Sequence, residues 1–206
     1  MMLPVRMADR WLSRREDGRG QGTVYWHMLM RDQPDVISLA REGQRRLAPF
    51  AAGLHMTPLE WLHMTTLVAG PAGALTPDDL DQMAITAQQL LAGVAPIAVT
   101  VGRILYHPEA IMLAASPAEA LMPIRNAAIE ATRQVATINP GSAWTPHATI
   151  CYSTADQAAQ PLIGALGMML PEREIRVCAL NLVVQHGPER DWNWTIERTV
   201  NLSRPG

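Results

Sequence analysis

The chain has 206 residues, of which 48% are apolar and 17% are charged, and its formal net charge is −2 at pH 7. This composition is typical of a soluble globular protein, either one ordinary domain or two small lobes that share a core, and at this length the core needs no disulfide or metal. The near-neutral charge argues against a strong electrostatic grip on long nucleic acid, but a local cluster of basic residues would suffice for a small anionic ligand.

The N-terminal segment, residues 1–22, is predicted to be flexible, ahead of a single bilobal domain at 23–206, because it ends in a polar, glycine-rich run. It lacks the apolar stretch of a secretory signal, and no apolar run approaches the ~18 residues of a membrane span. Basic residues gather early in the chain: Arg6, Arg10, Arg14, Arg15, Arg19, Arg41, Arg45 and Arg46. We interpret them as solvated, with a phosphate-facing role for one or two as the alternative.

Strand and helix patterns alternate through the rest of the chain, which predicts an α+β fold. The strands are expected at 23–30, 61–68, 97–106, 110–115, 147–152, 174–185 and 194–200. The helices are expected at 36–50, 77–92 and 116–137, with a shorter one ending near Gly167. The helix at 77–92 has the clearest start, because Thr76 caps it and Pro77 fits the first turn. Two stretches, 61–106 and 145–186, share the order strand, cap, helix, strand.

The two cysteines, Cys151 and Cys178, lie in strand-like apolar contexts. This setting predicts buried, reduced thiols rather than a disulfide framework or a metal motif. We therefore expect a cytoplasmic protein.

Two strands carry the same tripeptide, His63-Met64-Thr65 and His147-Ala148-Thr149. Because side chains alternate along a strand, each strand presents an imidazole and a hydroxyl on one face and buries the middle residue. Two imidazoles can act as acid and base near neutral pH, and two hydroxyls can donate hydrogen bonds to phosphate oxygens. If both strands lie centrally in one sheet, they form a cleft suited to phosphodiester chemistry without a metal.

A third copy, His55-Met56-Thr57, precedes Pro58 and follows Gly53. Proline interrupts a sheet ladder, so we interpret this copy as a connecting loop outside the site.

The paired tripeptides, each flanked by apolar residues and about 80 positions apart, resemble the motifs of the 2H phosphoesterase superfamily. That superfamily includes the RNA 2′,3′-cyclic phosphodiesterases, also called 2′-5′ RNA ligases. The resemblance implies a two-lobed α+β fold with pseudo-twofold symmetry, in which antiparallel sheets surround a central cleft and helices lie outside. It also implies hydrolysis of a 2′,3′-cyclic phosphate, with His147 favoured as base and His63 as acid, and with phosphate bound by Thr65 and Thr149.

Other residues are candidates for the cleft wall, with a place in the core as the alternative: His27, Trp144 and Tyr152. Many bacterial members of the superfamily carry a basic residue soon after the second motif, whereas this chain has Cys151-Tyr152-Ser153 there. A mononucleotide or another small cyclic phosphate is therefore as plausible a substrate as an RNA end.

The histidines show no metal-ligand spacing, so no metal or other cofactor is expected, and we expect a monomer that binds a small phosphorylated substrate and no membrane. The alternatives are 2′-5′ RNA ligation, a non-catalytic module that binds a nucleotide or RNA end, and a metal-dependent hydrolase that uses the same histidines.

Overall fold

The computed structural model describes residues 2–12, 22–141 and 143–203. Its α-helices are α1 (Pro34–Leu47), α2 (Pro77–Leu90), α3 (Met122–Arg133) and α4 (Gln160–Leu166). Its strands are β1 (Arg6–Met7), β2 (Thr23–Leu29), β3 (Leu54–Met56), β4 (His63–Pro71), β5 (Ile97–His107), β6 (Ala110–Ser116), β7 (His147–Ser153), β8 (Gln157–Ala158), β9 (Met169–Val177), β10 (Ala179–Gln185) and β11 (Trp194–Asn201). The predicted α+β class is confirmed.

Nine strands of the described chain form one antiparallel sheet in the order β11-β10-β2-β4-β7-β6-β5-β9, with β3 beside β7. We call β11-β10-β2-β4 the first lobe and β7-β6-β5-β9 the second lobe. The lobes meet where β4 pairs with β7 at Met64 and Ala148. The central residues of the two tripeptides are therefore partners across the lobe boundary.

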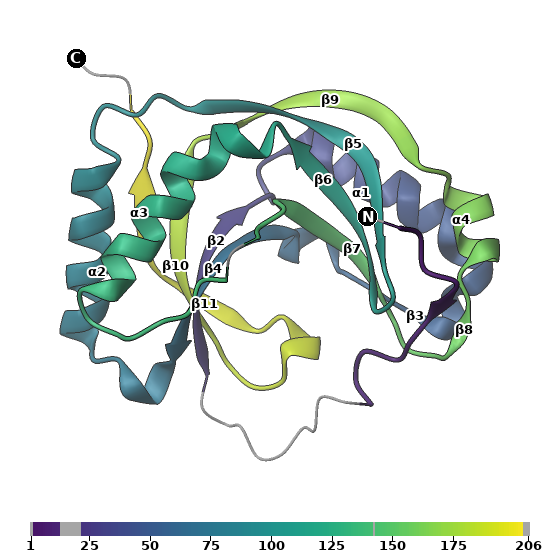
Figure 1. The fold of residues 1–206 in the computed structure, drawn as a ribbon, viewed down its shortest axis with the longest axis horizontal. Helices are drawn as coiled ribbons and strands as arrows, with labels where there is room; N and C mark the ends of the chain where they lie inside the picture. The colour runs from purple at the N-terminus through teal and green to yellow at the C-terminus, as the bar shows by residue number, and fades with distance from the viewer. Residues whose placement is uncertain (1, 13–21, 142, 204–206) are drawn as a thin grey trace.

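Helices cover the sheet in pairs, one pair for each lobe (Figure 1). Helices α2 and α3 pack on each other and on the first lobe, whereas α1 and α4 pack on each other and α1 packs on the second lobe. The predicted start of α2 is confirmed, since Thr76 and Asp79 form a reciprocal capping box. None of the helices in the described ranges has the length and apolar character that crossing a membrane requires.

The N-terminal residues 6–10 are docked on the domain, which corrects part of the predicted flexible segment 1–22. Strand β1 pairs with β8, Met7 is fully buried, and the Arg10 backbone N–H donates to the Ser153 carbonyl over 3.0 Å. The polar composition that predicted flexibility belongs to the later half of the segment, and residues 13–21 lie outside the described residues.

The strand predicted at 174–185 is two strands in different lobes. Strand β9 pairs with β5 in the second lobe, whereas β10 pairs with β2 and β11 in the first. Cys178 lies between them and is exposed, so its predicted burial is wrong, while Cys151 is buried as expected. No proline or glycine marks this crossover, so the apolar pattern is continuous in the sequence.

Candidate active site

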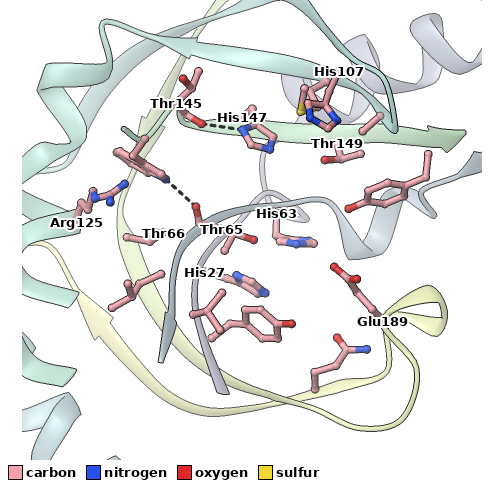
Figure 2. Close-up of a pocket in the computed structure, with 18 of the residues that line it drawn as sticks. His27, His63, Thr65, Thr66, His107, Arg125, Thr145, His147, Thr149 and Glu189 are labelled. Atoms are coloured by element: carbon pink, nitrogen blue, oxygen red, sulfur yellow. Dashed lines mark hydrogen bonds between the residues drawn. The ribbon is translucent and has the colours of Figure 1, made fainter. Parts of the chain in front are cut away.

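A cavity of about 630 Å³ lies at the lobe boundary, between the strands that carry the two tripeptides. It is lined by both predicted catalytic histidines and both predicted phosphate-binding threonines: His63, Thr65, His147 and Thr149. Figure 2 shows these side chains on neighbouring strands around one space. The four residues singled out from the sequence thus share a single cavity.

Strand pairing explains why these side chains converge. Met64 and Ala148 are Cα partners and are fully buried, so their neighbours on each strand face the opposite side. Antiparallel pairing about this point sets His63 across from Thr149, and Thr65 across from His147. The expected alternation within each tripeptide is confirmed.

Both histidine rings are held in the same way. The His63 Nδ1–H donates to the Trp61 carbonyl over 2.8 Å. The His147 Nδ1–H donates to the Thr145 carbonyl over 2.7 Å, a bond that Figure 2 shows. Because a carbonyl only accepts hydrogen bonds, the neutral ring carries its proton on Nδ1. The Nε2 atom of each ring is left with a lone pair that can accept a proton.

Burial lowers the pKa of both histidines. It lowers the pKa of His63 to about 4, an effect that the His147 ring reinforces and the Glu189 carboxylate opposes. Burial also lowers the pKa of His147, and His107 acts in the same direction. Both rings are therefore neutral at pH 7 in the free protein, and a bound anion would raise both pKa values.

Each strand bulges directly after its tripeptide. Thr66 is an extra residue in β4 between the pairs that Thr65 and Leu67 make with β2, and Ile150 is an extra residue in β7 opposite β6. A bulge inverts the alternation that follows it. Tyr152 therefore lines the cavity while Cys151 is buried.

The three predicted wall residues all line the cavity: His27, Trp144 and Tyr152. His27 is only 2% exposed, and its ring lies 4.2 Å from that of His63 and stacks on Tyr25. Burial lowers the pKa of His27 well below its usual value, as does the neighbouring His63. The Trp144 indole N–H donates to the Thr65 carbonyl over 3.0 Å, which fixes that ring beside the first tripeptide.

Two arginines line the cavity, Arg10 and Arg125. Neither comes from the residues that directly follow a tripeptide, where the sequence has no arginine. Arg10 reaches in from the N-terminal segment and bridges Glu109 (3.2 Å) and Glu189 (2.8 Å), which lie next to turns of different lobes. Arg10 thus lines the cavity, as the phosphate-facing alternative for the early arginines requires, but its guanidinium faces these two carboxylates. Sequence reasoning did not single out Arg125, Glu189 or His107, which reach the site from distant segments.

The third tripeptide lies outside the cavity. Leu54–Met56 form strand β3, which pairs with β7, so the predicted loop is wrong. The His55 ring stacks on Trp192 at 4.8 Å between centroids. Its exclusion from the site agrees with the sequence-based interpretation.

Within the described part of the chain, no three His, Cys, Asp or Glu side chains are grouped closely enough to hold a metal ion. The cavity offers instead two ring nitrogens, the threonine hydroxyls and two guanidinium groups, a set that suits an anionic ligand.

Comparisons with known proteins place this geometry in a family. A model described as the 2′-5′ RNA ligase superfamily matches residues 33–189. The fold is similar to that of TT0787 of Thermus thermophilus, at 16% identity over 89% of this chain and 100% of that chain, with a TM-score of 0.67. It is also similar to E. coli LigT, at 13% identity over 90% of this chain and 99% of that chain, with a TM-score of 0.63.

A third solved structure, the MHV ns2 PDE domain, is 12% identical over 80% of this chain and 99% of that chain, with a TM-score of 0.58. None of the curated proteins matches the sequence. At these identities the structural likeness shows the fold alone.

Proposed function

Because the chain belongs to the 2′-5′ RNA ligase superfamily, we propose that it is a metal-independent phosphodiesterase that hydrolyses a 2′,3′-cyclic phosphate. The observation that carries this proposal is the pair of tripeptides at one cavity, each with its histidine held through Nδ1 by a carbonyl. This arrangement leaves the Nε2 atom of one ring available to take a proton and that of the other, once it is protonated, available to deliver one.

In the proposed reaction, the Nε2 atom of His147 takes a proton from water as the water oxygen attacks phosphorus. The bond between phosphorus and one ribose oxygen breaks, and His63 protonates that oxygen. The hydroxyls of Thr65 and Thr149 donate to the non-bridging oxygens as negative charge builds on them. The product is a ribose phosphomonoester with a free neighbouring hydroxyl.

The proposed division of roles rests on the charges that face each ring. Burial is the largest influence and lowers the pKa of both histidines, but Glu189 raises the pKa of His63 whereas His107 lowers that of His147. We assign proton donation to His63, which the carboxylate faces, and proton abstraction to His147, although His63 has the more strongly lowered pKa of the two in the free protein. Since the pKa of His63 is about 4 in the free protein, the ring must be protonated together with binding of the anionic substrate.

The substrate class is supported by one of the structural neighbours. Solved structures of E. coli LigT hold 3′-AMP, ATP or phosphate. We propose that this chain likewise binds a small phosphorylated substrate, a cyclic nucleotide or an RNA end, and that it acts as a cytoplasmic monomer.

A second candidate activity, formation of a 2′-5′ linkage, is favoured by the family match. A ribose hydroxyl would then take the place of water, and the same histidines would exchange the same protons. Product analysis separates the two, because ligation joins two nucleotides and hydrolysis adds water. Tight nucleotide binding without either product would instead support the non-catalytic module.

The proposal is tested by hydrolysis of nucleoside 2′,3′-cyclic phosphates with EDTA present. We expect His63→Ala and His147→Ala each to lower kcat/KM by about 10³-fold, since each removes an acid or base. His55→Ala is the matched control, because it removes the histidine of the third tripeptide, outside the cavity, and should leave the rate unchanged. Full activity in both motif variants, or loss of wild-type activity with EDTA, would contradict the proposal.

A further inference from the structure

The end of the cavity next to Trp144 holds a buried cation. Arg125 projects from α3, is 5% exposed, and Figure 2 shows its guanidinium directed toward the cavity. Its Nη2 donates to the Pro140 carbonyl over 2.6 Å, and within the described residues it forms no ion pair with a carboxylate. Burial lowers the pKa of Arg125, as expected for a cation whose desolvation no carboxylate offsets.

The same end of the cavity holds an unsatisfied hydroxyl. Thr66 lines the cavity and is 3% exposed, and its Oγ1 has no hydrogen-bond partner among the described residues. Thr66 is the bulge residue of β4, and the equivalent bulge residue of β7 is Ile150, which is apolar and fully buried. An orphaned buried hydroxyl costs stability, and because Thr66 lines the cavity, a ligand bound there is in place to supply the missing acceptor.

These groups adjoin the phosphate-binding tripeptide. The Arg125 guanidinium lies 5.2 Å from the centre of the Trp144 ring, whose indole N–H holds the Thr65 carbonyl. Thr66 follows Thr65 directly. The second set of donors is therefore next to the place where the first phosphate is expected.

We propose that Arg125 and Thr66 form a subsite for a second phosphate of the substrate. A guanidinium makes short, charge-assisted hydrogen bonds to phosphate, and the bound phosphate would provide the acceptor that the Thr66 hydroxyl lacks. The substrate is then a 2′,3′-cyclic phosphate that carries another phosphate, either a 5′-phosphate or the preceding phosphodiester of an RNA end. This inference rests on the proposed function for the position of the first phosphate.

A purely structural role for Arg125 would account for part of the geometry. Its contact with Pro140 ties α3 to the loop that precedes β7. That role gives no reason for the hydroxyl of Thr66, nor for a guanidinium at the cavity surface. The experiment must therefore separate loss of the second phosphate from damage to the loop.

Binding is measured by calorimetry in a His147→Ala background, in which the ligand is not consumed. The probes are adenosine 2′,3′-cyclic phosphate, the same nucleotide with a 5′-phosphate, and an adenosine dinucleotide that ends in a cyclic phosphate and has no 5′-phosphate. We expect a probe with a second phosphate to bind at least about tenfold more tightly than the first probe. Whichever of the two is preferred identifies the source of the second phosphate.

Arg125→Gln should abolish the preference and leave the affinity for the first probe unchanged, whereas Arg125→Lys should keep part of it. Thr66→Val should also reduce the preference, by about three- to tenfold, while the Tm stays the same or rises because an orphaned hydroxyl is removed. Thr57→Val is the matched control, since Thr57 has another buried hydroxyl without a partner among the described residues but lies outside the cavity.

Equal affinity of the parent protein for all three probes would overturn the subsite. So would Arg125 and Thr66 variants that weaken every probe alike, because that result indicates a structural role. If the preference holds but the wild-type protein hydrolyses none of the probes, the proposed function fails and the subsite stands. If the wild-type protein hydrolyses the probes but binds all three equally, the subsite fails and the proposed function stands.

Discussion

The two lobes build their halves of the cavity in the same way and then surround them with different side chains. Each half presents His-x-Thr on a strand, buries the middle residue, holds the histidine Nδ1 by the carbonyl two positions earlier, and bulges after the threonine. The backbone plan is shared, so the positions of the imidazoles and hydroxyls are shared as well.

The neighbouring strands differ. The residue paired with Thr65 is His27, whereas the residue paired with Thr149 is Met112, and both line the cavity. The ring of Trp194 also packs against His63, 4.8 Å away. The comparison indicates that the backbone sets where the two histidines lie, while the flanking side chains set how readily each takes a proton.

Among the variants that test this comparison, the largest effect is expected where the halves are most alike. Thr65→Val and Thr149→Val each remove one hydroxyl donor without changing side-chain volume, and each should lower kcat by about 10²-fold. Steady-state kinetics on a nucleoside 2′,3′-cyclic phosphate measures this. Thr57→Val, in the third tripeptide, should have no effect on the rate. A large loss in only one of the two motif variants would break the comparison, since the halves would then differ in their chemistry.

A smaller effect is expected where the halves differ, at His27. Burial, together with His63, keeps the pKa of this imidazole well below its unfolded value of about 6.5, so the unfolded chain binds the extra proton first as the pH falls. Stability conferred above pH 6.5 is therefore lost below it, by at most about 2 kcal/mol at pH 5, the limit for an imidazole that stays neutral in the fold.

His27→Met places in the first lobe the residue type that the second lobe has at the equivalent position, Met112. The variant should lose most of the destabilisation that His27 causes at low pH. Urea unfolding of the wild-type protein and the variant at pH 7 and pH 5 checks this. The variant's free energy of unfolding should fall less on acidification, whatever its value at pH 7. An unchanged pH dependence would show that His27 titrates normally in the fold.

Much of the site could be predicted from the sequence, because its central elements obey local rules. Alternation along a strand sets His63 beside Thr65, and His147 beside Thr149, and the structure brings all four to one cavity. Helix α2 likewise begins at its predicted cap, Thr76. In each case the signal lies within a few residues of its consequence.

The rest depends on tertiary packing that leaves no local mark. The sequence predicts Tyr152 as a wall residue and Cys151 as buried, but not the bulge at Ile150 that puts them there, since strict alternation would have placed Cys151 in the cavity in place of Tyr152. Arg125 reaches the cavity from a helix whose pattern shows only an apolar face. The crossover at Cys178 moves the chain between lobes within an unbroken apolar run.

The smallest expected effect tests how the two histidines divide their roles. Burial is the strongest influence on the pKa of His63 and lowers it, whereas the Glu189 carboxylate raises it. Glu189→Gln should therefore lower this pKa further. If His63 is the acid, the reactive form has His63 protonated and His147 neutral, and that form becomes rarer. A partly exposed charge is worth up to about 1 kcal/mol, so kcat/KM near neutral pH should fall by up to about fivefold.

If His63 is the base, it is already neutral at that pH, and the rate near neutrality should not fall. Glu109→Gln is the matched control, because Glu109 also binds Arg10 but does not line the cavity. A loss confined to Glu189→Gln would assign the acid to the first lobe, where the carboxylate is. Equal losses in both variants would instead trace the effect to Arg10, and the difference between the lobes would then depend on the arginine that bridges them.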